Sequence, residues 1–512
     1  PDVRSAGMDP WKHFVEFGAK EGRQIFPFSN LVKFIEQLCK FTDEPTSKED
    51  IILYLVSEIY RIEREEFKEF SSLIRSVHFF TKANIERKCA KKFQLIVTHE
   101  LSRTGCPINA LNLAVGIQKK YPVIFLAMDG GEIQPEVEKL CNFFIKLPPP
   151  VKCNGLFIAK LIGLIGHFIE IETGILNSLV SYRAGKACRD VKAHSLLFIH
   201  EFSYYLPKSY LNDFQSDTDL LVFSNETIKK SFDATVKLSR PVLLINQGKS
   251  ETPESLVVRE VGEGQVKKEP EHKVDIIFNE LKDLKYKEGC KIILGVGSVG
   301  YRKGLDLFIS VSEGIKVQMA EGKVKFVWLG EFEKAFEAQY TNYLKAQIQI
   351  LGLKNHIIFP GSVQDVDRFY ELADLFLMTS RLDPLPGCVI EALSHGVPSL
   401  IFDKASGFPD FYRKAELDFC ICHYANTQEM VRKSLQLLQE NKLRTNIIQR
   451  GAKLVDDTFS FEHYVAKVEK LIHEINAKSE ITSFVANSLN KYINNGETMG
   501  GDDLEAKVVG EE

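Results

Sequence analysis

The stretch SRLDPLPGCVIEALSHGVPSLIFD, residues 380–403, decides the fold of this chain. The apolar run LFLMTS that leads into it predicts a buried strand, and the Pro/Gly turn that follows forbids a helix until about Cys388. The helix is predicted to close at Gly396, before a second buried strand, PSLIF. A strand, a turn and a helix start in this order predict a parallel α/β sheet in which free helix N–H groups can bind an anion.

Two acids lie eight positions apart in this stretch, at Asp383 and Glu391. Asp383 stands in the turn, and Glu391 is expected in the first turn of the helix, beside the N–H groups that would hold a diphosphate. In the bland interpretation Asp383 only caps the turn and Glu391 only complements the helix dipole. Taken with the turn between them, the two acids point to a sugar-nucleotide site.

The segment resembles the signature of family 4 retaining glycosyltransferases of the GT-B fold, in particular the bacterial polysaccharide enzymes of capsule or O-antigen type. The resemblance implies that Asp383 lies by the donor sugar and that Glu391 binds the ribose hydroxyls. The family has Glu where this chain has Asp383, so the reach is one methylene shorter and the sugar preference stays open. The turn residues that we place against the donor are Pro386, Gly387, Cys388 and Val389.

Residues 295–300, GVGSVG, follow a predicted strand and match the dinucleotide-binding pattern G-x-G-x-x-G. The next residues, YRKGLDLF, resemble the family's Lys-Gly motif, in which Lys303 would contact the donor diphosphate and offset charge on the leaving group. Many relatives carry an Arg five residues before this Lys, where this chain has Ser298, and Arg302 is our expected substitute. Either cation could also be only an exposed side chain at a helix start.

Two loops of the first half of the chain carry further candidates. His200 follows the run LLFI, at a strand end where open α/β sheets bind ligands, and the family has a His at a comparable place. It could instead be a hydrogen-bonded core residue; as a catalytic residue it would have Glu201 to orient its ring or the acceptor. Thr104 and Gly105 resemble the Gly-bearing loop that closes over the donor, or they form a simple tight turn.

Gly361 and Ser362 follow the strand HIIFP in the second half. They correspond to the loop that meets the nucleobase through backbone groups in the family.

Two series of short apolar runs, before and after a charged stretch at 248–272, predict two parallel-sheet domains in tandem, the GT-B arrangement. The resemblance covers 93–475. The expected divisions are an N-terminal helical extension at 1–92, an acceptor-side domain at 93–250, a linker at 251–272, a nucleotide-sugar-binding domain at 273–455, a C-terminal crossover helix at 456–478 and a largely disordered tail at 479–512. Residues 9–29 resemble a short module of bacterial polysaccharide glycosyltransferases.

Composition limits the class of protein. The 512 residues suit two large domains, and a net charge of -4 argues against a nucleic-acid binder. The 10 cysteines have no zinc spacing, and Cys420 and Cys422, expected on one strand, read as reduced core residues of a cytoplasmic protein. No signal peptide or membrane-spanning stretch is evident, and the start at Pro1 without Met suggests a fragment, so other domains of a larger enzyme are conceivable partners.

The apolar segment 155–171 leaves one question of location open. It fits a buried helix of the N-terminal sheet, which we favour, or a helix at the inner face of a membrane, where a lipid-linked acceptor would be reached.

The sequence therefore predicts a retaining enzyme that transfers a sugar from a nucleotide diphosphate sugar to a carbohydrate or lipid-linked glycan, in bacterial surface polysaccharide synthesis. The cations at 302 and 303 with a helix N-terminus would stabilise the leaving group, and no Asp-x-Asp motif is present, so neither a metal nor another cofactor is expected. Two alternatives remain: a catalytically idle donor-binding or scaffold domain of a larger polymerase, and an NAD-dependent oxidoreductase with GVGSVG on the phosphates and Glu331 on the ribose.

Overall fold

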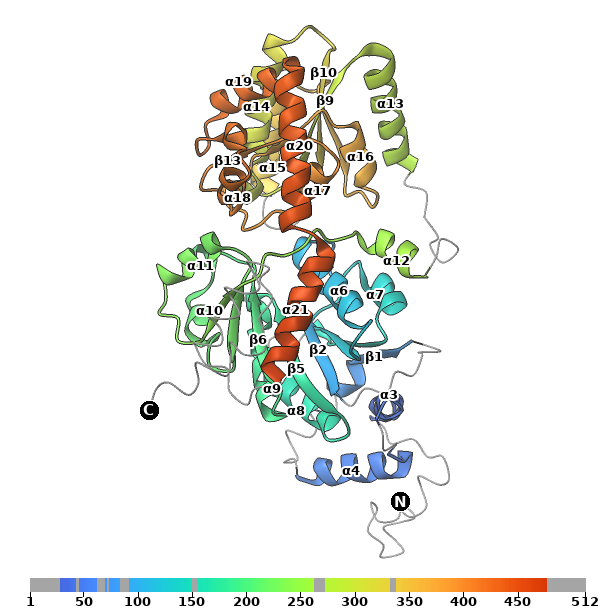
Figure 1. Cartoon of the computed structure of the whole chain (residues 1–512). Helices are drawn as coiled ribbons and strands as arrows, with labels where there is room; N and C mark the ends of the chain where they lie inside the picture. Colours follow the sequence, from blue (N-terminus) through green and yellow to red (C-terminus); the bar gives the residue numbers. More distant parts are fainter. Residues whose placement is uncertain are drawn as a thin grey trace, which may run out of the picture.

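The computed structural model describes residues 28–42, 46–61, 70, 73–82, 92–149, 155–261, 272–331 and 338–476. Two α/β domains are stacked along the long axis of the molecule, the N-terminal one below the C-terminal one in Figure 1. The predicted module at 9–29, except its last two residues, and the predicted tail lie outside the described residues. The predicted fold class, two Rossmann-like parallel-sheet domains, is confirmed.

The N-terminal domain contains an eight-stranded sheet in the order β1-β4-β3-β2-β5-β6-β7-β8. All neighbouring strands are parallel except β1 and β4. The strands are β1 (His78–Thr81), β2 (Lys92–Thr98), β3 (Val123–Ala127), β4 (Phe143–Lys146), β5 (Glu170–Asn177), β6 (His194–Ile199), β7 (Leu220–Phe223) and β8 (Val242–Leu244).

Strand β5 was not predicted from the sequence, although it lies at the centre of this sheet between β2 and β6. Its sequence, EIETGILN, breaks the apolar run with Thr173 and Gly174, which hid the strand. The structure explains the glycine: a Cβ there would lie 2.2 Å from Cys188 Sγ, so only Gly lets helix α9 (Gly185–Asp190) pack this closely. The end of β5 therefore brings Asn177 to the carboxyl edge of the sheet.

Alternating side chains of the parallel strands feed two hydrophobic cores, one on each face of this sheet. The helices on one face are α6 (Gly105–Ile117), α7 (Gln134–Leu140), α12 (Pro253–Val261) and α21 (Phe461–Asn476). Those on the other are α3 (Ser29–Cys39), α4 (Lys48–Arg61), α8 (Gly155–Gly166), α9, α10 (Lys208–Asp213) and α11 (Glu226–Asp233).

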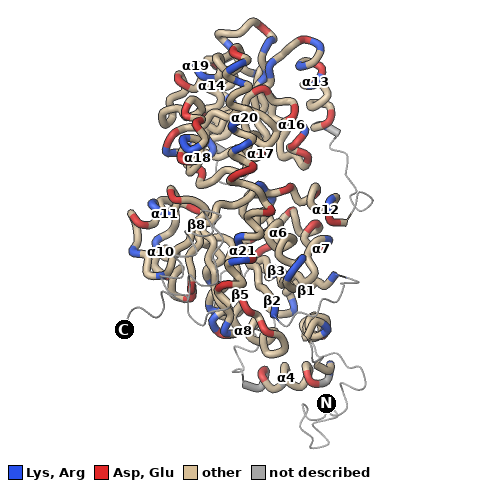
Figure 2. Tube along the Cα trace, viewed as in Figure 1, with Lys and Arg blue, Asp and Glu red and all other residues tan. Residues whose placement is uncertain are grey.

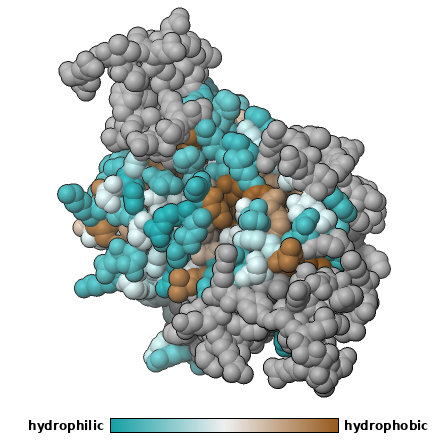
Figure 3. Space-filling model, turned by 90° about the horizontal axis from the view of Figure 1, so that it is seen from below, coloured by the Kyte–Doolittle hydropathy of each residue, from teal (hydrophilic) through white to brown (hydrophobic). Residues whose placement is uncertain are grey.

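These helices bear on two interpretations of the sequence. The charged stretch that we read as an unpatterned linker contains α12, whose Leu256 and Val257 are buried in the N-terminal core. The apolar segment 155–171 is a buried helix, α8, followed by the start of β5, which fits the interpretation that we favoured. Among the described residues of α4 and α8, the large hydrophobic side chains of Leu53 and Leu156 are exposed. In Figure 3, which views the molecule from below, the coloured surface mixes hydrophilic side chains with small hydrophobic patches.

The C-terminal domain contains a six-stranded parallel sheet in the order β11-β10-β9-β12-β13-β14. The strands are β9 (Lys291–Val296), β10 (Val324–Leu329), β11 (Ile357–Gly361), β12 (Leu375–Met378), β13 (Ser399–Phe402) and β14 (Ile421–Cys422). The helices are α13 (His272–Glu288), α14 (Leu305–Gln318), α15 (Ala338–Ile350), α16 (Asp367–Leu372), α17 (Gly387–Ser394), α18 (Phe408–Lys414), α19 (Thr427–Gln439) and α20 (Asn441–Thr458).

The cysteines at the edge of this sheet were predicted on one strand, and that is wrong. Cys420 ends a 3-10 turn, Asp418–Cys420, and only Cys422 belongs to the two-residue strand β14. Both thiols are free and buried, and burial raises the pKa of each to about 12.

Helices α20 and α21 join the two domains from the C-terminal side (Figure 1). Helix α20 packs in the C-terminal core, and α21 packs in the N-terminal core through Tyr464, Val468 and Leu471. The contact with α6 is close, because a Cβ at Gly116 would lie 2.7 Å from Val465 Cγ2. Charges of both signs are interspersed along both domains in Figure 2. Among the described residues, no helix has the length and apolar character needed to cross a bilayer.

Candidate active site

Helix α17 begins at Gly387, with Pro386 as its N-cap residue in an extended conformation. Proline is suited to this place, since it has no N–H to leave unpaired and cannot continue a helix backwards. The first turn of a helix has N–H groups without intrahelical partners, and here they belong to the residues from Gly387 on. Glu391 is the fifth residue of the helix and thus lies in its second turn, so our placement of it beside these N–H groups is wrong.

Glu391 instead faces helix α16. Its carboxylate accepts a hydrogen bond from the Tyr370 hydroxyl at 2.9 Å, and that hydroxyl also lies 3.2 Å from the Cys388 carbonyl. Tyr370 is fully buried and stacks on the His395 ring at 5.4 Å. Burial raises the pKa of Glu391, while the Tyr370 hydrogen bond opposes that rise. Tyr370 could not be predicted from the sequence, because its contact with Glu391 depends on how α16 packs on α17.

Asp383 lies between the two cations that we predicted at the diphosphate. Lys303 Nζ is 2.6 Å from Asp383 Oδ2, Arg302 Nη1 is 3.3 Å from Oδ1, and the Ser380 hydroxyl is 3.3 Å from Oδ2. Burial alone would raise the pKa of Asp383, but the charges of Lys303 and Arg302 lower it below its usual value. Asp383 is therefore an anion that fixes the cations in place.

Glycines in the loop between β9 and α14 make this ion-pair cluster possible. Gly304 has a φ of 69°, and a Cβ there would lie 2.1 Å from the Thr379 carbonyl oxygen. The same two loops are joined by the Arg381 N–H, which donates to the Arg302 carbonyl at 2.8 Å. Because the backbones touch, Lys303 reaches Asp383 directly across the carboxyl edge of β9 and β12.

Arg381 strengthens this junction with its side chain. It contacts both carboxylate oxygens of Asp306, at 2.9 and 2.6 Å, and its guanidinium lies 3.9 Å from the centre of the Tyr301 ring. Paired Arg–carboxylate contacts are geometrically specific, so they fix the start of α14 against the turn that carries Asp383.

The glycines of GVGSVG have packing roles. A Cβ at Gly295 would lie 2.6 Å from the Trp328 ring, and one at Gly330 would lie 2.0 Å from the Gly297 carbonyl oxygen, which accepts the Trp328 indole N–H at 2.8 Å. Gly297 lies against the Lys303 side chain. Gly295 and Gly297 thus allow the end of β9 to lie close to Trp328 and Lys303.

His200 comes directly after β6, at the carboxyl edge of the N-terminal sheet. Its Nε2 lies 3.1 Å from Asn177 Oδ1, and its Nδ1 is buried with no hydrogen-bond partner among the described residues. Burial, and to a lesser degree the charge of His99, lowers the pKa of His200 to about 4, so the ring is neutral at physiological pH. Glu201 accepts from the backbone N–H groups of Leu179 and His200, and burial raises its pKa.

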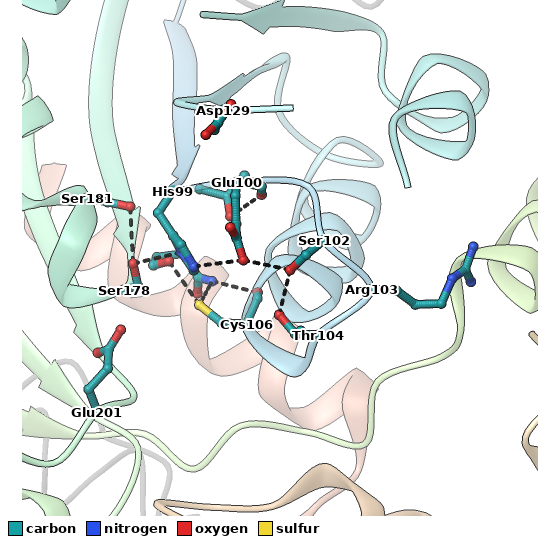
Figure 4. Close-up of polar contacts among 12 residues, drawn as sticks. His99, Glu100, Ser102, Arg103, Thr104, Cys106, Asp129, Ser178, Ser181 and Glu201 are labelled. Atoms are coloured by element: carbon teal, nitrogen blue, oxygen red, sulfur yellow. Dashed lines mark hydrogen bonds and ion pairs between the residues drawn. The ribbon is translucent and has the colours of Figure 1, made fainter. Parts of the chain in front are cut away.

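Thr104 and Gly105 begin α6 at the same edge (Figure 4). The Thr104 hydroxyl lies 2.9 Å from the Ser102 hydroxyl, which donates to Glu100 at 2.6 Å. A Cβ at Gly105 would meet nothing within 4 Å, so there is open space beside this loop. Arg103 fixes the loop from outside through an ion pair with Glu254 of α12 at 2.5 Å.

The Asp383 turn contacts both domains. Leu382 packs against the N-terminal core, Gln247 donates to the Leu385 carbonyl at 3.0 Å, and Asn225 donates to the Pro384 carbonyl at 3.3 Å. The pKa of Tyr205, five residues after His200, is raised to about 12, mainly by burial. The charges of Glu201, Arg302 and Asp383 are close enough to contribute to this shift. The candidate residues of the two domains thus face a shared interdomain region.

The predicted site residues form three groups in the structure. Lys303 and Arg302 both contact Asp383, Pro386 to Val389 form the N-cap and first turn of the helix that carries Glu391, and Thr104 and Gly105 lie at the start of α6, at the same sheet edge as His200. Gly361 and Ser362 lie apart, at the end of the edge strand β11, where Gly361 has a φ of 95° and its carbonyl accepts the Gly330 N–H at 2.8 Å. Among the described residues, no hydrogen bond or ion pair joins Gly361 or Ser362 to the other groups.

Comparison with known proteins gives matches in sequence and in fold. Residues 277–454 match the family described as Glycosyl transferases group 1. An uncharacterized glycosyltransferase of Haemophilus influenzae is 22% identical over 384 residues, which are 73% of this chain and 98% of that protein. The alpha-galactosylglucosyldiacylglycerol synthase of Streptococcus pneumoniae is 29% identical over 183 residues, 35% of this chain and 45% of that protein.

Among solved structures, Anabaena HepE in complex with UDP and glucose is similar, with a TM-score of 0.61 at 15% identity. The similarity covers 75% of this chain and 100% of that one. At this identity the likeness shows the fold, and it agrees with the two stacked parallel-sheet domains described above. The group 1 match and the glycosyltransferase relatives agree with this fold: the chain is a GT-B glycosyltransferase.

Proposed function

We propose that the chain is a retaining, family 4-like glycosyltransferase that moves a sugar from a nucleotide diphosphate sugar to a carbohydrate or lipid-linked glycan acceptor. Its role would be in bacterial surface polysaccharide synthesis, on the cytoplasmic side of the membrane. The observation that carries the proposal is the cluster of Lys303, Arg302 and Asp383, which lies just before the start of α17 and whose charges reach Tyr205 of the N-terminal domain.

The chemistry of the cluster suits a diphosphate leaving group. Arg302 is about half exposed, while Lys303 is largely buried and held by Asp383. Fixed cations and helix N–H groups stabilise negative charge without reorganising during the reaction, which is the largest single contribution in many enzymes. With two cations and one carboxylate the cluster keeps a net positive charge, so we propose that transfer needs no divalent metal.

Glu391 would accept hydrogen bonds from the ribose hydroxyls, oriented by Tyr370. Gly361 and Ser362, at the end of β11, would meet the nucleobase, and the loop at Thr104 and Gly105 would cover the donor from the N-terminal side. His200 would contact the reacting sugar. Retention would then follow from attack on the face from which the diphosphate leaves, with the phosphate assisting the acceptor hydroxyl.

A lipid-linked acceptor has support from the Streptococcus pneumoniae relative, whose name describes the synthesis of a glycolipid. The Anabaena structure, whose title includes UDP and glucose, makes UDP-glucose a reasonable first donor to test. Contact with the membrane would be peripheral in this proposal.

The direct test is to incubate the purified chain with a panel of UDP-, GDP-, ADP- and dTDP-sugars and to follow their consumption by NMR. We expect slow hydrolysis of one α-linked donor, with the α-anomer of the sugar released first. The matched controls are Lys303→Ala, which should abolish consumption, and Lys316→Ala, which removes a cation at the distant end of α14 and should not. Absence of consumption of every donor with folded protein, in the presence of glycan acceptors, would favour the idle scaffold domain.

A further inference from the structure

Asn177, at the end of β5, is completely buried and contacts His200 on one side and Cys106 of α6 on the other. Its amide Nδ2 donates to the Cys106 carbonyl oxygen at 3.0 Å, and its own backbone carbonyl accepts the Cys106 thiol at 3.2 Å. A carbonyl oxygen can only accept, so Nδ2 must face Cys106 and Oδ1 must face His200. The orientation of the amide is therefore set by the start of α6.

The orientation of the amide decides the state of the His200 ring. Oδ1 has no proton to give, so the 3.1 Å contact requires that His200 Nε2 carries the proton. In a neutral imidazole the other nitrogen is then a bare acceptor. That nitrogen, Nδ1, is the buried atom without a partner among the described residues. An unpaired buried acceptor is costly, and a ligand hydroxyl would remove the cost.

We propose that Asn177 is a positioning residue, which fixes His200 in the Nε2-protonated neutral tautomer so that Nδ1 accepts a hydrogen bond from a hydroxyl of the reacting sugar. This inference rests on the proposed function for the identity of the ligand, but the tautomer is a property of the free protein. Asn177 also ties the Thr104–Gly105 loop to His200, because its Nδ2 bond is made to the residue that follows Gly105.

The titratable groups around His200 and Asn177 come from three places: His99, which follows β2, Cys106 on α6, which bonds to Asn177, and Glu201, next to His200 in the chain. His99 is bonded to the Ser178 hydroxyl at 3.1 Å through Nδ1 (Figure 4). Glu201 binds the backbone N–H of His200 with its carboxylate. Among the described residues, the hydrogen-bond partner of the His200 imidazole ring is Asn177.

The test uses the full chain labelled with ¹⁵N-histidine, with His200 assigned by its loss in His200→Gln. The wild-type spectrum at pH 7 should show a protonated Nε2 and a bare Nδ1. Asn177→Ala should mix the two tautomers and lower kcat for donor hydrolysis about tenfold or more, with the Kd of the nucleoside diphosphate changed less than about twofold. Asn112→Ala is the matched control. Like Asn177, Asn112 has a fully buried amide, but it lies on α6 and bonds to Ile108 and Glu251 rather than to His200.

Asn177→Asp tests the same idea by rescue. Asp still accepts from Nε2, so the tautomer should be kept, but its second oxygen cannot donate to the Cys106 carbonyl, and its charge should make His200 easier to protonate. Relative to Asn177→Ala, hydrolysis should thus recover in part at pH 8 and fall toward pH 6, which a change in packing alone would not produce. The inference is overturned if the wild-type ring carries its proton on Nδ1, if Asn177→Ala leaves the tautomer unchanged, or if it changes the tautomer without lowering kcat. A wild-type chain that turns over no donor but has the expected spectrum would overturn the proposed function and the sugar as ligand, and would leave the tautomer assignment standing.

Discussion

Lys303 Nζ lies 2.6 Å from Asp383 Oδ2, across the boundary between the loop after β9 and the turn before α17. Both side chains are largely buried, so the pair is screened little by solvent, and Arg302 adds a second cation to the same carboxylate. In the free protein Asp383 is therefore paired with the two cations that would bind the diphosphate in the proposed function. The Asp383 carboxylate and the diphosphate would compete for Lys303 and Arg302, and this competition can be measured.

Asp383→Asn should tighten the binding of nucleoside diphosphate while destabilising the free protein. The substitution removes the competing anion and leaves Lys303 without its buried partner, at a cost of about 3 kcal/mol. Titration calorimetry with UDP and thermal unfolding with and without UDP would measure both effects. Weaker UDP binding with unchanged stability would show that Asp383 does not hold the cations.

Gly304→Ala should disrupt the site more than the same substitution at Gly322, a glycine with a similar positive φ. Gly304 and Gly322 have φ values of 69° and 72°, but a Cβ at Gly304 would lie 2.1 Å from the Thr379 carbonyl oxygen, whereas one at Gly322 would meet nothing within 4 Å. Each alanine stores backbone strain of about 1–2 kcal/mol, and only Gly304→Ala also displaces Lys303. We expect it to lose UDP binding and Gly322→Ala to keep it. Equal binding by the two variants would argue against the close loop contact.

The buried His200 should make stability depend on pH. Its pKa is lowered in the folded protein from 6.5 to about 4, so the unfolded chain binds more protons between these values. Stability attributable to the neutral ring is therefore complete above pH 6.5 and is lost as the pH falls toward 4. Between pH 7 and pH 5 the wild type should lose about 2 kcal/mol more than His200→Gln. Urea unfolding at the two pH values would measure this, and parallel losses would place His200 in a solvated environment.

Sugar transfer should survive excess EDTA, because the charge of the leaving diphosphate would be met by residues 302 and 303. The measurement is the donor turnover of metal-stripped protein. Loss of turnover that Mg²⁺ or Mn²⁺ restores would mean that a metal carries this charge.

The sequence predicted most where a signal is local. The Pro/Gly turn and the helix after it, with Asp383 and Lys303 at loop positions, could be recognised because backbone restrictions act over a few residues. The sequence-based prediction failed where contacts between distant segments determine the structure. Strand β5 was hidden by Gly174, which is needed only because Cys188 packs on it, and with β5 Asn177 was missed.

The same distinction applies within the site. Glu391 was expected beside free N–H groups, but the helix begins at Gly387 and places it one turn further, against Tyr370. The ion pair of Asp383 with Lys303 joins residues 80 positions apart and depends on the order of strands β9 and β12. Neither relationship is written in residue spacing, so only the three-dimensional structure reveals it.

The measurement that tests the proposed donor site most directly is calorimetry of Lys303→Ala and Glu391→Ala with uridine, UDP and UDP-glucose, or with the matching set for whichever donor the panel selects. If Glu391 binds the ribose, its removal should weaken all three ligands by about 1–3 kcal/mol. Lys303→Ala should leave the nucleoside unchanged and weaken the two diphosphates by a similar amount. Equal losses for all three ligands with Lys303→Ala would show that Lys303 does not bind the diphosphate, and would contradict the site.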